Sequence, residues 1–131
     1  MTQVAKGDFV VKLLPLSFEG QPDGSKLGRM SIDKTITGDL VATTQGQMLS
    51  ATTDVKGSAG YVAIERVQGT LNGKKGSFVL QHTGTMNKGA PSLSVTVVPD
   101  SGTDELVGLS GTFHIILDKG RHSYEFSYSL P

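Results

Sequence analysis

The feature that most constrains this fold is strict alternation of side-chain character along the last segment, residues 122–130. Aromatic and aliphatic side chains occupy one set of alternate positions and small or charged side chains occupy the other. Successive side chains of a strand point to opposite faces, so this pattern predicts a strand with one buried face. The buried set is His122, Tyr124, Phe126, Tyr128 and Leu130.

The same alternation recurs along the chain, between short stretches rich in Gly, Pro, Asn and Asp. No window of 11 or more residues keeps a helical apolar rhythm free of Gly or Pro. We therefore predict an all-β protein, with 131 residues in a single domain. The strands are expected at residues 9–16, 27–37, 39–44, 47–53, 60–71, 76–86, 92–98, 111–117 and 122–130.

Long strands joined by tight turns favour a closed antiparallel up-and-down barrel of about eight strands, because closure removes exposed sheet edges. A β-sandwich is the alternative. The Asn72-Gly73 pair is the strongest hairpin signal, and a two-residue turn there places Leu71 opposite Lys74. That register puts Glu65 opposite about position 80 and diagonal to His82.

Composition excludes several classes of function. The chain has 12 basic and 12 acidic residues, which argues against nucleic-acid and anionic-membrane partners. It has no cysteine, hence no disulfide, thiolate nucleophile or Cys-ligated zinc. No cofactor-binding motif is present, and no apolar run reaches the length of a signal core or a membrane span. We expect a soluble cytoplasmic protein without a cofactor.

Polar side chains share the apolar faces of several predicted strands, although burying a charge is costly unless it is paired. They suggest a pocket at one mouth of the barrel. The candidate catalytic residues are Glu65, His82 and His122, and the candidate ligand-binding residues are Lys34, Tyr61 and Tyr124.

These residues allow more than one chemistry. Glu65 and a histidine could act as an acid–base pair, or the polar groups could only orient a ligand. A metal site of Glu65, His82 and His122 is disfavoured, since no close His–His spacing supports it. The same residues could instead be structural, with an ion pair between Glu65 and Lys34.

Three blocks carry a family resemblance: GYVAIERVQGTLNGKKGSFVLQHTGTM, VVPDSGTDELVGLSGTFHI and HSYEFSYSLP. They resemble a bacterial family of small uncharacterised proteins, which is similar to the allene-oxide-cyclase-like barrel group. The resemblance implies an eight-stranded antiparallel barrel with a central cavity, which holds a hydrophobic substrate in the plant proteins. No catalytic motif of the plant proteins maps onto this chain.

The leading hypothesis is a barrel that binds a small, partly apolar molecule in an internal cavity. The alternatives are an isomerase or cyclase-like enzyme using Glu65 and His82, and a structural module with a filled interior. Val62 and Ile64 are expected on the outer face, where exposed apolar residues can mark a contact between copies of a homo-oligomer.

Overall fold

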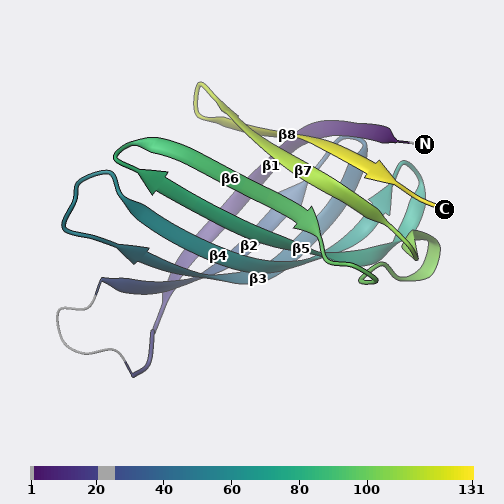
Figure 1. The fold of residues 1–131 in the computed structure, drawn as a ribbon. Coiled ribbons are helices and arrows are strands. Elements are labelled where there is room, and N and C mark those ends of the chain that lie inside the picture. The colour runs from purple at the N-terminus through teal and green to yellow at the C-terminus, as the bar shows by residue number, and fades with distance from the viewer. Residues whose placement is uncertain (1, 21–25) are drawn as a thin grey trace.

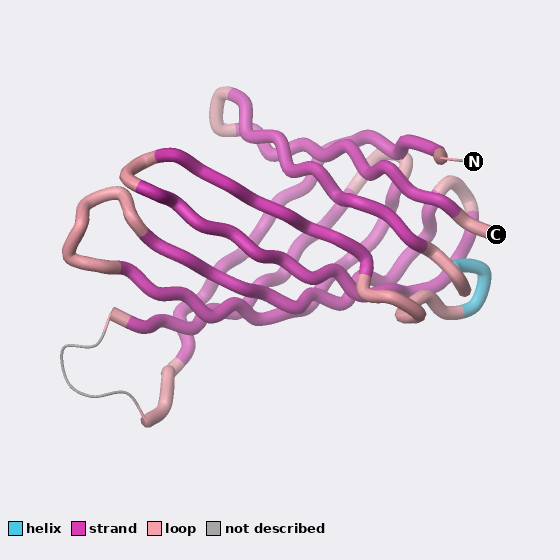
Figure 2. The backbone as a smooth tube through the Cα atoms, viewed as in Figure 1, coloured by secondary structure: helices cyan, strands magenta, loops and turns pink. Residues whose placement is uncertain are grey.

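The computed structural model describes residues 2–20 and 26–131. Within them, antiparallel strands close into a barrel with the order β1-β2-β3-β4-β5-β6-β7-β8, as Figures 1 and 2 show. The strands are β1 (Gln3–Leu16), β2 (Leu27–Ile36), β3 (Leu40–Thr52), β4 (Ala59–Leu71), β5 (Lys74–Asn87), β6 (Ala90–Val97), β7 (Ser110–Asp118) and β8 (Arg121–Ser129). The predicted up-and-down barrel is confirmed, and the sandwich alternative is wrong.

Two predicted strands, 39–44 and 47–53, form the single strand β3. Gly46 separates them in the sequence, but it does not turn the chain. A Cβ at Gly46 would lie 2.3 Å from the carbonyl oxygen of Ile64, so glycine allows close approach of β4 within a continuous strand. Strand β1 also begins earlier than predicted, at Gln3. The break predicted between the strands at 9–16 and 27–37 contains residues 21–25, which lie outside the described residues.

One half of the barrel is filled by packed aromatic rings. The Phe113 ring stacks on Tyr124 with centroids 5.1 Å apart, and the Phe78 ring stacks on Phe126 at 5.7 Å. Tyr128 packs against Phe126 from the same strand. All five side chains are fully buried, so this half is a solid core that burial of apolar area stabilises.

The segment 98–109 completes the wall of this filled half. The Val98 and Thr103 backbone N–H groups donate to carbonyl oxygens of β5, in place of a neighbouring strand. Ser77, which alternation places on the outer face, is therefore covered and only 5% exposed. The segment contains a short 3₁₀ helix, η1 (Asp104–Leu106), whose Leu106 side chain is buried in the core.

The other half of the barrel is open along one side. β8 pairs with β1 only over Gln3–Asp8, although β1 continues to Leu16. β6 and β7 pair only at Thr96 and Thr112 in the described part of the chain. The β7–β8 hairpin thus separates from β6 and ends before β1 does, and β1–β6 continue beyond it as a curved sheet (Figure 1). We call this extension the cup.

No helix within the described ranges is long and apolar enough to cross a membrane.

Candidate functional site

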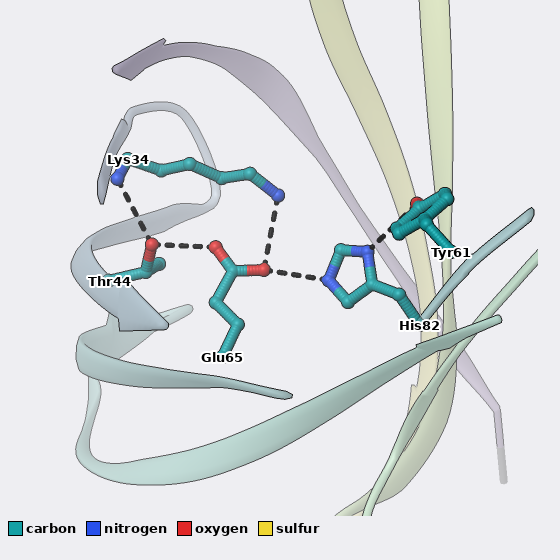
Figure 3. Close-up of polar contacts among 5 residues, drawn as sticks. All are labelled: Lys34, Thr44, Tyr61, Glu65 and His82. Atoms are coloured by element: carbon teal, nitrogen blue, oxygen red, sulfur yellow. Dashed lines mark hydrogen bonds and ion pairs between the residues drawn. The ribbon is translucent and has the colours of Figure 1, made fainter. Parts of the chain in front are cut away.

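Glu65 lies at the centre of a buried polar cluster between the filled half and the cup. Its Oε1 atom accepts hydrogen bonds from Lys34 Nζ at 3.1 Å and from His82 Nε2 at 2.8 Å. Its Oε2 atom accepts one from Thr44 Oγ1 at 2.6 Å. Figure 3 shows the carboxylate held between these partners from β2, β3 and β5. The carboxylate is completely buried, yet both of its oxygens are satisfied.

These contacts keep Glu65 ionised. Burial alone would raise the pKa of its carboxyl, because a low-dielectric interior disfavours charge. The hydrogen bond from His82, the charge of Lys34 and the hydrogen bond from Thr44 together outweigh burial and lower this pKa from 4.5 to about 2. The cluster therefore contains a permanent carboxylate at neutral pH.

The register of the β4–β5 hairpin brings His82 to Glu65. Asn72 and Gly73 both have positive φ, as the predicted two-residue turn requires, and Leu71 pairs with Lys74. Glu65 consequently lies opposite Leu80, one diagonal step from His82. The predicted contact between Glu65 and His82 is confirmed.

Tyr61 connects this cluster to the cup. Its hydroxyl lies 3.4 Å from His82 Nδ1, on the side of the imidazole opposite Glu65 (Figure 3). Partial burial, and then the negative charge of Glu65, raise the pKa of the Tyr61 phenol, which therefore stays protonated at neutral pH. Gly84 lies opposite Tyr61 on β5, and a Cβ there would be 2.4 Å from Tyr61 Cε1. The missing side chain thus leaves space for the Tyr61 ring.

The Lys34 ammonium is bounded by aromatic rings on its other sides. Nζ lies 4.9 Å from the centroid of Phe9 and 5.9 Å from that of Phe113. Such cation–π contacts partly replace the water that a buried ammonium loses. The ion pair between Glu65 and Lys34, which the sequence suggested as a structural alternative, is therefore present and almost fully buried.

Above Tyr61, the concave face of the cup contains a cavity of about 380 Å³. This volume falls within the range of small-molecule sites. Three of the four methionines of the chain lie on this face, at positions 30, 48 and 86. Methionine side chains are flexible and adapt to ligands of different shape. The cavity lining includes Met48, Tyr61, Gly84, Met86, Pro91 and Leu93.

The structure places two of the predicted site residues elsewhere. The His122 ring packs on Phe9 at 5.2 Å between centroids, so one aromatic ring separates it from Lys34. Tyr124 donates a hydrogen bond to Thr37 O at 2.7 Å and accepts one from Leu40 N at 3.1 Å. Tyr124 therefore ties β8 to the β2–β3 turn, whereas Glu65, His82, Lys34 and Tyr61 form the cluster.

Sequence reasoning missed Thr44 and most of the cavity lining. Thr44 carries no signal, because threonine is common in strands whatever it contacts. The clustering of methionines on inward positions could have been read from alternation once the faces were assigned. In the described ranges, no group of three or more His, Asp or Glu side chains is arranged to hold a metal ion.

The outer face of β3 and β4 carries the apolar residues predicted there. Val62 and Ile64 are 51% and 54% exposed, and Leu49 lies directly opposite Val62. Their outward orientation is confirmed. Self-association through this face stays a prediction.

Known proteins identify the family but no activity. A search of curated proteins finds no match. A crystal structure of a DUF3224-family protein of unknown function from Shewanella oneidensis MR-1 is 52% identical to this chain. The two structures superpose with a TM-score of 0.94, covering 100% of this chain and 98% of that one. Residues 5–128 match the family model described as a protein of unknown function (DUF3224). The chain therefore belongs to the DUF3224 family.

Proposed function

We propose that this protein binds a small, largely apolar molecule in the cup. The observation that carries the proposal is the cavity above Tyr61, which is lined by apolar side chains such as Met48 and Leu93. Leu93 and Met86 remain 47% and 43% exposed there, although apolar side chains on an inward face normally gain free energy from burial. A ligand of matching size would cover them.

The sequence resemblance to allene-oxide-cyclase-like barrels agrees with this proposal, because the plant members hold a hydrophobic substrate in the barrel. The structural alternative is supported by the filled aromatic half and by the complete hydrogen bonding of the buried cluster. It leaves the open cavity without a role, and for that reason we favour ligand binding.

An acid–base enzyme is the second candidate, supported by the hydrogen-bonded series from Tyr61 through His82 to Glu65. Of these three residues, Tyr61 lines the cavity, while His82 and Glu65 are buried beneath it. The residue that meets a substrate would then be Tyr61. Glu65 and His82 would then act on a substrate through Tyr61, whereas the sequence hypothesis gave them a direct acid–base role.

Binding can be tested with a neutral fluorescent apolar probe, phenylnaphthylamine, and with native mass spectrometry of the purified protein for a co-purified ligand. We expect the wild type to bind the probe with enhanced fluorescence. Leu93→Glu places a carboxylate in the apolar wall and should weaken binding roughly tenfold or more.

The matched control is Leu117→Glu, because Leu117 is 67% exposed on β7 and does not line the cavity. Its probe affinity should equal that of the wild type. The proposal fails if the wild type neither binds the probe nor carries a ligand. It also fails if the two glutamate variants lose binding equally.

A further inference from the structure

The direction of the hydrogen bonds in the buried cluster is fixed by Glu65. An ionised carboxylate can only accept hydrogen bonds, and Glu65 accepts from Lys34, Thr44 and His82. His82 Nε2 must therefore carry a hydrogen and donate it. In a neutral imidazole the other nitrogen, Nδ1, then has no hydrogen and acts as an acceptor.

Nδ1 in turn fixes the orientation of the Tyr61 hydroxyl. A phenol has one hydrogen, and the acceptor at 3.4 Å is Nδ1 of His82. With that hydrogen directed to His82, the Tyr61 oxygen offers only lone pairs to any further partner. The contact is long for a hydrogen bond, so the cost of turning the hydroxyl away from His82 lies at the low end of the range for an unpaired buried acceptor.

The other hydroxyls near the cavity do not impose a direction. Ser50, Thr52, Thr85 and Ser92 line the cavity, and a serine or threonine hydroxyl rotates to donate or accept as its partner requires. The polarity of the cavity floor is therefore set by the series that begins at Glu65.

We infer that the cup selects an apolar ligand whose polar group donates a hydrogen bond, namely an alcohol or a phenol. This inference rests on the proposed function and adds the ligand class. A ketone or a carboxylate presents only lone pairs, which would face the lone pairs of Tyr61. Placing either oxygen against Tyr61 would require turning the Tyr61 hydrogen away from His82 and leaving Nδ1 buried without a donor.

Three eight-carbon probes differ mainly in this polar group: n-octanol, hexyl methyl ketone and octanoate. Each is used to displace phenylnaphthylamine from the wild-type protein at mildly alkaline pH. We expect n-octanol to compete roughly tenfold better than hexyl methyl ketone or octanoate. Leaving a buried acceptor unpaired lowers the affinity by about a factor of ten.

The variant His82→Gln tests the origin of the preference. The glutamine amide can still donate to Glu65, but the Nδ1 acceptor is gone and the Tyr61 hydrogen is released toward the cavity. The preference for n-octanol over the ketone should disappear or reverse. The matched control is His114→Gln, an exposed histidine on β7, which should keep the wild-type preference.

The outcomes separate this inference from the proposed function. Probe binding with equal displacement by n-octanol and the ketone, or with stronger displacement by octanoate, overturns the inference and leaves the cavity proposal standing. Absence of probe binding overturns both. If His82→Gln does not fold, the wild-type order of the three competitors still decides the inference.

Discussion

Replacing Glu65 by glutamine should remove a specific, pH-dependent part of the stability. The carboxylate pKa is lowered from 4.5 to about 2 in the folded protein, with His82, Lys34 and Thr44 as the groups that lower it. The ionised carboxylate of Glu65 is therefore more stable in the folded protein than in the unfolded chain. Glutamine keeps the shape, and its amide oxygen can still accept from Lys34 and His82, but its NH2 group would face the Thr44 hydroxyl as a donor and the charge is removed.

The magnitude follows from this pKa. Since one pKa unit corresponds to about 1.4 kcal/mol, the drop from 4.5 to about 2 contributes about 3 kcal/mol to the free energy of unfolding. A lowered carboxyl pKa stabilises the fold at pH values above 4.5, and the contribution is lost as the pH falls toward 2. Between neutral pH and about pH 3, roughly 2 kcal/mol should be lost through Glu65 alone.

The assay is urea denaturation followed by circular dichroism, at neutral pH and in mild acid, because the chain has no tryptophan to report by fluorescence. Glu65→Gln should be about 3 kcal/mol less stable than the wild type at neutral pH, and the two proteins should converge in acid. Glu125→Gln, at a partly exposed position on β8, should track the wild type at both pH values. A Glu65→Gln variant whose stability falls with acid as steeply as the wild type would refute the reasoning.

Two further substitutions test the parts of the site separately. Gly84→Ala places a Cβ against the Tyr61 ring, so probe affinity should fall several-fold. Ser94→Ala, at an exposed position of β6 that does not line the cavity, should leave affinity unchanged, and equal affinities of the two variants would contradict the packing argument. Tyr124→Phe removes the hydroxyl that bonds Thr37 and Leu40, and should lower the free energy of unfolding by about 1–3 kcal/mol in urea denaturation. Loss of probe binding by a folded Tyr124→Phe protein would instead place Tyr124 in the site.

The local parts of the fold could be predicted because local chemistry determines them. Alternation assigned the buried face of β8, and the Asn72-Gly73 turn fixed the register of β4 against β5. That register alone placed Glu65 near His82. Lys34 was assigned to the correct face in the same way, and its ion pair with Glu65 follows from the register of β2, β3 and β4.

The depth of each residue along the barrel axis could not be predicted. His122 occupies one of the alternate positions of β8 that face the interior. It lies beside Phe9 because of the pairing of β1 with β8, which joins the two ends of the chain. No turn connects those strands, so nothing local specifies their register. Sequence reasoning also missed that residues 98–109 form part of the barrel wall. This segment has no alternating pattern, although its backbone forms hydrogen bonds to β5.

The separation of the β7–β8 hairpin from β6 has a consequence for how such a chain can evolve or be redesigned. It divides the barrel into a half whose aromatic rings hold the fold together and a half whose inward residues are partly exposed. Substitutions at positions such as Leu93 or Met86 therefore change the shape of the cavity while disturbing few contacts of the aromatic core. Under the proposed binding function, a chain built in this way can change its ligand preference by small steps, each of which leaves the scaffold able to fold.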